Sequence, residues 1–528
     1  MKVLITEEVS PAGIELLRAD PRIEVDVCIG LPTAELHQRI ADYEAVITRS
    51  GTAVDAALLD AGKKLKIVAR AGVGIDNVDV DCASSKGIIV VNAPFGNTNS
   101  AAEHTMAIML AVCRNVVDAH NCLKTGAWKR APFTGSELKG KTLGIIGLGK
   151  VGGRVATRSK AFEMEVIACD PYIPKKRGDD LGVRLVPLDE IITECDIISV
   201  HTPLNDETRG MICAEHFERM KDGVYIINCA RGGIIEEEAM LAALESGKVR
   251  GAAFDVWSSE PPTEKVKSLI AHPRMVVTPH IGANTFEAQT NVSVDVSREI
   301  INYLDGRPFE NAVNMPKFDP ALMEQMRPFV NLVHQLGRFL AQLAPANPSK
   351  VTFTYNGKLA DYDCEPLTVC GLAALLNRRL TQEVNMVNAR MVANQMSLTI
   401  EEIRSTESEA YSNLVTMTLE ADTKRKTVAG TLFEGVPRIV KMRDFQTDFQ
   451  PVGDMLVMSY QDRPGMLGKI GTVLGEVGVN IAAMNLGRRS KAGEAMVVFS
   501  LDSPVPEDVL AKLAEAVEAS FVQAVDMN

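Results

Sequence analysis

The feature that most constrains the fold of this chain is a run of six short apolar segments between residues 141 and 282. Each segment is rich in Val and Ile and too short for a buried helix, and a helical pattern separates it from the next. This alternation predicts βαβ units that build one parallel, doubly wound sheet with both faces covered. The predicted strands are "KTLGIIGLG" (141–149), "EVIACD" (165–170), "DIISVHTP" (196–203), "VYIINCARG" (224–232), "GAAFDVW" (251–257) and "MVVTPHIG" (275–282).

A glycine-rich turn, "GLGKVG" at residues 147–152, follows the first of these strands and opens a predicted helix. Its glycines permit a tight turn, close approach of the backbone to a pyrophosphate, and close packing of the helix on the strand. Asp170 ends the next predicted strand, where a carboxylate can bind ribose hydroxyls. The pattern predicts a Rossmann-type domain that binds a dinucleotide, with NAD favoured over NADP because a carboxylate repels a 2′-phosphate.

The first 92 residues show the same alternation of apolar runs and helical patterns, which predicts a second parallel sheet. A helical stretch from Thr285 to about Tyr303 could return to pack on this first unit. The predicted strands of the first unit are "KVLIT" (2–6), "AVIT" (45–48), "LKIVARAG" (65–72) and "IIVVN" (88–92).

A long apolar stretch, residues 99–128, joins the two strand series. Ser100 and Glu103 have the spacing of a capping box, and Gly126 suits a helix C-terminus. We therefore expect one continuous helix between them. The sequence leaves open whether this helix is buried in the chain or lies between subunits.

The pattern changes beyond residue 305. Residues 306–320 are rich in Pro, Gly and Asn, as in a linker, and residues 318–450 mix strand and helix signals without a catalytic motif. Residues 448–454 indicate another boundary, and the last 75 residues have the order βαββαβ. The six elements are "MLVMSYQ" (455–461), "MLGKIGTVLGEVG" (466–478), "NIAAMNLGR" (480–488), "AMVVFSLD" (495–502), "PEDVLAKLAEAVE" (506–518) and "FVQAVDM" (521–527).

Composition excludes several classes of function. The formal net charge of −12 argues against a general nucleic-acid or anionic-membrane surface, although it allows a local basic pocket. No apolar run approaches the roughly 18 residues of a membrane span, and "MKVLITEEVS" lacks the apolar core of a signal peptide. The 10 cysteines are scattered without CxxC pairs or zinc-like spacing, so we expect no metal site and reduced thiols in a cytoplasmic protein.

Three residues at predicted strand ends are candidates for catalysis. Arg231 ends the fourth strand of the second series, and a guanidinium there can hold a carboxylate through two parallel hydrogen bonds. Glu260 and His280 come near the ends of the next two strands, and a carboxylate beside an imidazole orients the ring and stabilises its charged form. Each alone could be a surface turn residue. Together with the glycine-rich turn they predict proton transfer beside a bound dinucleotide.

The motifs "GIIGLGKVG", "NCARGGIIEEEAM", "AAFDVWSSEPP" and "TPHIGANT" resemble the D-isomer-specific 2-hydroxyacid dehydrogenases. "ARAGVGIDNVD" and "VNAPFGNTNSAAEHT" narrow the resemblance to members that act on 3-phosphoglycerate, and "DRPGMLGKIG" resembles an ACT regulatory domain. The resemblance covers almost the whole chain. It implies a Rossmann-type NAD-binding domain (98–285) inserted in a flavodoxin-like substrate domain (1–97 and 286–315), an α+β intervening domain (316–450) and a βαββαβ ACT domain (454–528).

The resemblance also implies an activity, the NAD-dependent oxidation of D-3-phosphoglycerate to 3-phosphohydroxypyruvate, which begins L-serine synthesis. His280 would be the general base, Glu260 would stabilise the imidazolium, and Arg231 would hold the substrate carboxylate. Implied substrate contacts are Arg49, Ser50, Arg70, Asn97 and Arg130, the last in a neighbouring subunit's site. Implied cofactor contacts are Val73, Gly147, Gly149, Lys150, Val151, Gly152, Asp170, Thr202, Cys229, Ala230, Asp255, Gly282 and Ala283.

Asp462 and Asn480 match ACT positions that hold an amino-acid ligand between two subunits. We therefore expect L-serine as effector and a homo-oligomer, dimer or tetramer, while an ACT domain used only for assembly stays open. Another 2-hydroxyacid dehydrogenase, such as a glyoxylate or hydroxypyruvate reductase, is an alternative function. A non-catalytic NAD-sensing corepressor is a second alternative, against which the complete Arg-Glu-His set speaks.

Overall fold

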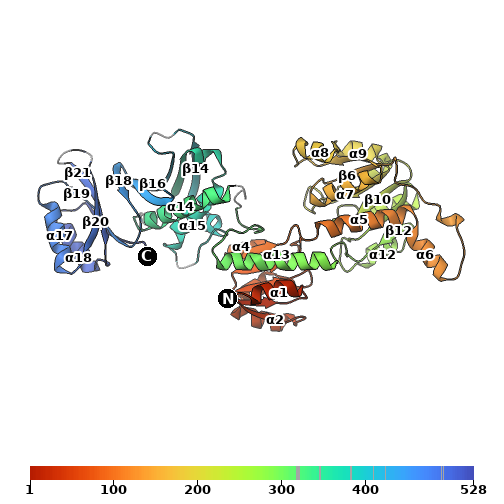
Figure 1. The fold of residues 1–528 in the computed structure, drawn as a ribbon, viewed down its shortest axis with the longest axis horizontal. Coiled ribbons are helices and arrows are strands. Elements are labelled where there is room, and N and C mark those ends of the chain that lie inside the picture. Colours follow the sequence, from red (N-terminus) through yellow and green to blue (C-terminus); the bar gives the residue numbers. More distant parts are fainter. Residues whose placement is uncertain are drawn as a thin grey trace.

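The computed structural model describes residues 1–316, 322–343, 347–380, 383–407, 410–422, 424–488, 490 and 493–528. Within these ranges the strands form four sheets that follow one another along the chain. Figure 1 shows the first sheet with its helices at the bottom, the second at the upper right, and the two C-terminal sheets on the left. The predicted fold class, two parallel α/β units followed by α+β units, is confirmed.

The first sheet is parallel, with the strand order β2-β1-β3-β4-β5. This is the flavodoxin-like order that the resemblance implied. Helix α13 comes after the whole second sheet and returns to pack against α1, β4 and β5. The elements are β1 (Lys2–Ile5), α1 (Pro11–Arg18), β2 (Glu24–Val27), α2 (Thr33–Arg39), the 3-10 helix η1 (Ile40–Asp42), β3 (Ala45–Thr48), α3 (Ala56–Ala61), β4 (Ile67–Arg70), α4 (Val80–Ser85), β5 (Ile89–Asn92) and α13 (Phe286–Leu304).

The second sheet is also parallel, with the order β12-β11-β10-β9-β6-β7-β8. Chain order reverses between β6 and β9, and ligands of doubly wound sheets bind at such a switch point, outside the carboxyl ends of the strands. The strands are β6 (Thr142–Ile146), β7 (Glu165–Cys169), β8 (Arg184–Leu185), β9 (Ile197–Val200), β10 (Val224–Asn228), β11 (Val249–Phe254) and β12 (Met275–Val277). The helices after them are α7 (Lys150–Ala161), α8 (Lys175–Leu181), α9 (Leu188–Glu194), α10 (Ala214–Arg219), α11 (Glu237–Glu245) and α12 (Glu264–Ile270).

The sequence predicts ten of the twelve strands in these two sheets and misses β2 and β8. Both missed strands lie at a sheet edge. None of the four residues of β2 is buried, and β8 has only two residues, neither of them buried. An edge strand pairs on one side and needs no continuous apolar run, so the signal that identified the other strands is absent here.

The single helix predicted between Ser100 and Gly126 is wrong. Two helices occupy this stretch, and they part at Asn115, whose φ of +50° is a left-handed conformation that Asn tolerates better than most residues. The capping box is also absent, because the first helix begins after Asn97 and Ser100 Oγ lies 2.8 Å from Thr285 Oγ1. The elements are α5 (Thr98–Cys113), α6 (Val116–Lys124) and the 3-10 helix η2 (Ala131–Phe133).

The third sheet has the order β14-β13-β15-β16-β17-β18, antiparallel except for the β13–β14 pair. A long helix, α14, precedes the strands of this sheet. The elements are α14 (Met323–Leu343), β13 (Lys350–Gly357), the 3-10 helix η3 (Lys358–Asp361), α15 (Glu365–Asn377), α16 (Ala389–Gln395), β14 (Thr399–Ser405), β15 (Asn413–Ala421), β16 (Lys424–Phe433), β17 (Val436–Met442) and β18 (Phe445–Phe449).

The fourth sheet is antiparallel, with the order β20-β21-β19-β22, and its βαββαβ chain order is the predicted one. Side chains alternate between its two faces. Leu456 and Met458 pack with the helices of this unit, whereas Met455 and Val457 join the apolar core of the third sheet. The two C-terminal sheets therefore share one core. The elements are β19 (Asp454–Gln461), α17 (Met466–Glu476), β20 (Ile481–Arg488), β21 (Glu494–Leu501), α18 (Glu507–Ala516) and β22 (Phe521–Asp526).

A search of the described residues for helices that could cross a bilayer finds none with the necessary length and apolarity. In the same residues, no three side chains of the usual metal-binding types gather into a group that could hold an ion.

Candidate active site

The three candidate catalytic residues follow three neighbouring parallel strands. Arg231 lies in the loop after β10, Glu260 in the loop after β11, and His280 directly after β12. Strands β10, β11 and β12 are adjacent in the sheet, so their carboxyl ends share one edge. The fold thus places these loops side by side at the edge where ligands of this architecture bind.

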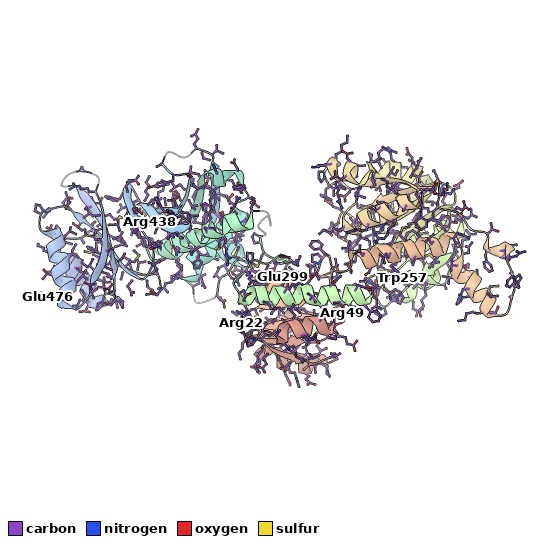
Figure 2. All side chains as sticks on the ribbon, in the orientation of Figure 1. Arg22, Arg49, Trp257, Glu299, Arg438 and Glu476 are labelled. Carbon is purple, nitrogen blue, oxygen red and sulfur yellow. The ribbon has the colours of Figure 1, made fainter. Side chains whose placement is uncertain are left out.

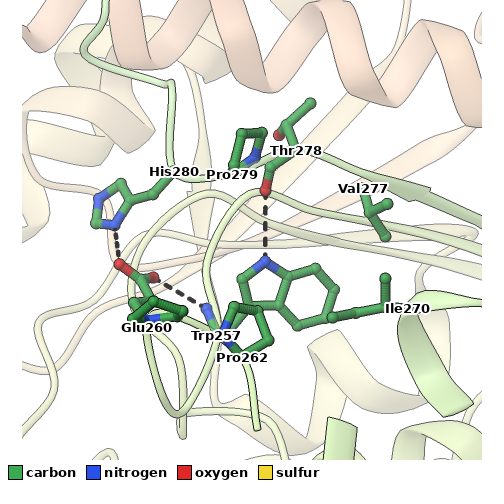
Figure 3. Close-up of a pocket in the computed structure, with 9 residues that line it drawn as sticks. Trp257, Glu260, Pro262, Ile270, Val277, Thr278, Pro279 and His280 are labelled. Atoms are coloured by element: carbon green, nitrogen blue, oxygen red, sulfur yellow. Dashed lines mark hydrogen bonds and ion pairs between the residues drawn. The ribbon is translucent and has the colours of Figure 1, made fainter. Parts of the chain in front are cut away.

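His280 and Glu260 meet at this edge. His280 Nδ1 lies 2.6 Å from Glu260 Oε2, and Trp257 N–H donates to Glu260 Oε1 at 3.1 Å (Figure 3). Burial opposes ionisation of Glu260, but the hydrogen bond and charge of His280 and the Trp257 N–H outweigh it, so the pKa of Glu260 lies below its ordinary value. An ionised carboxylate only accepts hydrogen bonds. His280 Nδ1 therefore carries the proton, which leaves Nε2 with its lone pair free for a substrate.

The pair is open to ligands. The side chains of His280 and Glu260 are 44 % and 37 % exposed, and both line a cavity of about 460 Å³. Trp257 and Ile270 form part of the apolar wall of this cavity, and Trp257 Nε1 donates to the carbonyl of Thr278 at 3.4 Å (Figure 3).

A second histidine that follows a strand of this sheet, His201, has different surroundings from those of His280. His201 directly follows β9 in the same sheet, with its Nε2 2.9 Å from Ser199 Oγ. Burial lowers its pKa to about 4, so it is neutral near pH 7. His280 differs from it in exposure and in its carboxylate partner.

Arg231 faces the first sheet across the loops. Its Nε lies 3.5 Å from Asp76 Oδ2, in the loop after β4, and its Nη1 donates to the carbonyl of Ala230 at 2.8 Å. A Cβ placed on Gly74 would lie only 2.5 Å from Arg231 Nη2, so glycine lets the guanidinium rest against this loop. Asp76 is 75 % exposed and was not among the residues that the sequence singled out.

Three guanidinium groups gather here. Arg70 ends β4 and Arg49 follows β3, a neighbouring strand. Burial lowers the pKa of Arg70, and the nearby charges of Arg231 and Arg49 lower it further. Arg70 Nε is buried without a hydrogen-bond partner among the described residues. Figure 2 shows Arg49 at the side of the first sheet that lies toward the second sheet. Such a group of cations suits an anion with more than one charge.

The glycine-rich turn has the shape that a pyrophosphate requires. Gly147 has φ +93°, and a Cβ on Gly152 would lie 2.1 Å from the Gly147 carbonyl oxygen. A Cβ on Gly149, the residue directly before α7, would meet nothing within 4 Å. The space beside the residue that precedes α7 is therefore open, and a helix N-terminus next to open space suits an anion. Thr202 Oγ1, after β9, is buried and has no partner in the described residues.

Asp170 lies directly after β7, next to this turn. Its Oδ2 accepts from Leu148 N–H at 2.9 Å and its Oδ1 from Tyr172 N–H at 3.0 Å, which leaves further lone pairs for ribose hydroxyls. Lys150, at the start of α7, lies with its Nζ 2.8 Å from the centre of the Phe95 ring. The hydrogen-bonding groups at this edge and the shape of the glycine-rich turn fit a dinucleotide such as NAD.

The other predicted cofactor residues lie in loops at the same edges or in α7. Burial raises the pKa of Cys229 to about 12, so its thiol stays neutral. Asp255 is 1 % exposed and its carboxylate accepts hydrogen bonds from the loop after β12. The remaining residues are Val73 after β4, Val151 in α7, Ala230 after β10, Gly282 and Ala283 after β12, and the predicted substrate residues Ser50 after β3 and Asn97 before α5.

Three predicted residues lie outside this edge. Arg130 is exposed in the segment after α6, away from the loops that carry the other candidates. In the fourth sheet, Asp462 Oδ2 accepts from Arg488 at 3.2 Å, and Asn480 Nδ2 donates to Asp502 at 2.7 Å.

Sequence reasoning missed His104 and Thr278 as well as Asp76. His104 lies on α5 and contacts Thr278, at the start of the His280 loop. The available signal was the pair Glu103-His104, which stands shortly before the apolar run at the end of α5.

Three family models match the chain. Residues 106–282 match the D-isomer specific 2-hydroxyacid dehydrogenase NAD binding domain, residues 325–443 the D-3-phosphoglycerate dehydrogenase intervening domain, and residues 455–518 the ACT domain. A D-3-phosphoglycerate dehydrogenase of Archaeoglobus fulgidus is 41 % identical over 528 residues, covering 99 % of this chain and 100 % of that protein. The chain belongs to the D-3-phosphoglycerate dehydrogenase family.

Other relatives of this family include the D-3-phosphoglycerate dehydrogenase of Bacillus subtilis, 36 % identical over 527 residues, with 100 % of this chain and 99 % of that protein covered. Among solved structures, a protein from Thermus thermophilus has a TM-score of 0.55 at 34 % identity, over 59 % of this chain and all of that one. The D-lactate dehydrogenase of Aquifex aeolicus, solved with NAD and lactic acid, has a TM-score of 0.53 at 28 % identity, over 60 % of this chain and 100 % of that one. The second sheet thus belongs to an NAD-binding domain of a dehydrogenase family.

Proposed function

We propose that this chain oxidises the C2 hydroxyl of D-3-phosphoglycerate to give 3-phosphohydroxypyruvate, with NAD as cofactor, in the first step of L-serine synthesis. The observation that carries this proposal is the 2.6 Å contact of His280 with Glu260, at the same sheet edge as the glycine-rich turn. Full-length similarity to D-3-phosphoglycerate dehydrogenases supports the choice of substrate.

NAD, when bound, supplies the hydride acceptor. His280 Nε2, the nitrogen left unprotonated by the bond to Glu260, takes the proton of the substrate hydroxyl as general base. Glu260 stabilises the imidazolium that results and keeps the ring in one orientation. In the reverse direction the same nitrogen returns the proton to the forming hydroxyl.

Different arginines bind the two anionic groups of the substrate. Arg231 binds the C1 carboxylate with its planar pair of N–H donors, and Asp76 keeps the guanidinium turned toward the first sheet. Arg49 and Arg70 bind the phosphate from strand ends of the first sheet, where burial and like charge make Arg70 favour an anionic partner. Thr202 and the first N–H groups of α7 bind the cofactor phosphates.

The ACT unit makes a regulatory site for L-serine, with Asp462 for the amine and Asn480 as donor and acceptor. The assembly is a homo-oligomer, in which Arg130 reaches a neighbouring subunit's site. Exposed apolar side chains in and just after α6 support a subunit contact in this region, namely Val116, Val117, Leu123 and Trp128. All ten cysteines are free, which accords with a cytoplasmic location.

The deciding experiment measures NADH oxidation with 3-phosphohydroxypyruvate and, in parallel, with glyoxylate. We expect kcat/KM to be higher with 3-phosphohydroxypyruvate by about 10²-fold or more, since a site built for a charged group discriminates strongly against analogues that lack it. Equal rates would indicate a glyoxylate or hydroxypyruvate reductase, and no turnover with either would support a corepressor. Adding L-serine to the same assay tests the regulatory site.

A further inference from the structure

We infer that His104 is a positioning residue for the reaction: through Thr278 and Asp255 it holds the loop that carries His280. The expected effects on kcat and KM rest on the proposed function. The expected effect on the position of the loop does not. His104 comes from α5, and His280 follows β12, so the contact joins two elements that are far apart in sequence.

The loop from Thr278 to Gly282 is organised around the carboxylate of Asp255. The Thr278 hydroxyl donates to Asp255 Oδ1, Ile281 N–H donates to the same oxygen at 2.9 Å, and Gly282 N–H donates to Oδ2 at 2.8 Å. His280 N–H donates to the backbone carbonyl of Asp255 at 2.8 Å. The residues on both sides of His280 are therefore tied to one buried carboxylate, and His280 itself to the backbone of the same residue.

His280 needs this support because its backbone is strained. Its φ is +54°, a left-handed conformation that residues with a Cβ rarely adopt without surrounding structure to hold them. The 2.6 Å contact of the catalytic pair thus depends on the hydrogen bonds that hold the loop.

His104 supplies the donor that completes the set around Asp255. Its Nε2 lies 3.1 Å from Thr278 Oγ1 and 3.3 Å from Asp255 Oδ1. Because the Thr278 hydroxyl hydrogen points to Asp255, the Thr278 oxygen can only accept from His104. The protonated nitrogen facing the loop is therefore Nε2, and the chain of donors runs from His104 to Thr278 to Asp255.

Loss of the His104 donor would destabilise a carboxylate, that of Asp255, which water cannot reach. Asp255 is 1 % exposed, and the side chain of His104 is 16 % exposed. Burial opposes ionisation of Asp255, and His104, with its Nε2 3.3 Å from Asp255 Oδ1, is the largest of the influences that nevertheless keep the pKa of Asp255 below its ordinary value. A buried carboxylate that loses a donor must find another or move, and the loop moves with it.

Space around the loop leaves little room for another partner. A Cβ on Gly282 would lie 3.0 Å from Asp255 Oδ2 and 3.7 Å from His104 Cδ2. The backbone at Gly282 thus packs directly against both side chains. A substitution at position 104 that removes the donor but fills the same volume isolates the hydrogen bond from the packing.

The test compares His104→Phe, which keeps a ring but has no donor, with His104→Gln, which places an amide N–H near the position of Nε2. His37→Ala, at a histidine of α2, is the control for loss of a histidine elsewhere. For D-3-phosphoglycerate oxidation we expect His104→Phe to lower kcat about 10- to 100-fold, the range for a small misplacement of a catalytic group. Its KM for substrate should change less than about threefold, and His104→Gln should recover most of the lost kcat.

Two further measurements separate positioning from a general structural role. With substrate deuterated at C2, the isotope effect on kcat should be larger in His104→Phe than in wild type, because a misplaced base makes the chemical step slower relative to product release. A crystal structure of His104→Phe should show a longer distance between His280 and Glu260 than in wild type, while α5 and β12 keep their places. If Phe destabilises the fold, His104→Ala serves in the same comparisons.

The inference is overturned if His104→Phe keeps the wild-type kcat, or if Phe and Gln lose kcat equally. An unchanged His280–Glu260 distance in the crystal structure would also overturn it. If wild type itself fails to oxidise D-3-phosphoglycerate, the proposed function falls, and the crystal structures still decide whether His104 holds the loop.

Discussion

The two halves of the chain use candidate ligand-binding residues in different ways. In the first half, residues spread over 50 positions of sequence meet at one sheet edge, as His280 and Glu260 do with Arg231 in the neighbouring loop. In the fourth sheet, Asp462 and Asn480 instead pair with Arg488 and Asp502 of the same unit.

The difference follows from strand direction. In a parallel sheet every strand delivers its carboxyl end to the same edge, so one chain suffices to assemble a site. In an antiparallel sheet neighbouring strands end on opposite edges, so residues that follow neighbouring strands do not gather at one edge. A site there needs a surface from elsewhere, such as a second copy of the chain. Function in the first half is thus expected to respond to single substitutions within one chain, and function in the second half to depend on assembly.

The largest expected effect is that of His280→Ala. Removal of the proposed general base should lower kcat about 10³- to 10⁴-fold, in the upper part of the range for positioned acid–base groups, while the Kd for NADH stays near the wild-type value. Steady-state kinetics and NADH fluorescence titration measure the two quantities. Turnover near that of wild type would show that the parallel-sheet edge is not where the proton moves.

Glu260→Gln should lower kcat by about 10²-fold, because an amide keeps the shape but cannot stabilise the imidazolium by charge. Measurement of kcat from pH 7 down to acid provides the check. The folded-state pKa of Glu260 lies below its ordinary value of 4.5. The advantage of the wild type should therefore be fully present above pH 4.5 and disappear as pH falls through the lowered pKa. An advantage that persisted unchanged in acid would mean that the charge of Glu260 is not what matters.

Arg49→Ala should raise KM for D-3-phosphoglycerate about 10- to 100-fold, since it removes a charged hydrogen bond to the phosphate. KM for an unphosphorylated 2-hydroxyacid should change less than about threefold by the same reasoning. Arg18→Ala, at an exposed arginine of α1, is the matched control. Equal effects on both substrates would argue against a phosphate contact at this position.

The smallest expected effect is that of Asp462→Ala on regulation. Inhibition by L-serine should weaken by about 10-fold or more, because the carboxylate proposed to bind the amine is lost. Glu476→Ala, at the end of α17 (Figure 2), removes a carboxylate from the same unit and should leave the response intact. If L-serine does not inhibit the wild-type enzyme, the fourth sheet is left with a role in assembly. The two halves would then differ in that only the first binds a small-molecule ligand.

Much of the catalytic half could be predicted because buried parallel strands leave an unambiguous apolar signature. The residue that follows such a strand lies at a known edge, so Arg231, Glu260 and His280 could be named before their contacts were known. Contacts between the loops of two different sheets leave no such signature. Nothing in the loop after β4 marks Asp76 as the partner of Arg231, because that pairing depends on how the first sheet faces the second.

The break between α5 and α6 escaped prediction for a different reason. Apolar residues continue past Asn115, so the periodic signal does not stop, yet none of the residues of α6 is buried within the chain. The same apolar character can serve a core or a surface contact, and sequence pattern does not distinguish them. Arg130 follows this exposed helix, and its placement could not be read from the chain alone.

The common core of the third and fourth sheets has a consequence for how such chains can be rearranged in evolution. An ACT unit joined only by a linker could be exchanged between enzymes by recombination, with its surface unchanged. Here Met455, Val457, Val498 and Val525 have become interior residues of a neighbour's core. If the ACT unit were moved to another protein without the third sheet, these apolar side chains would be exposed to water. Such a transfer would therefore require the third sheet as well, or polar substitutions on this face.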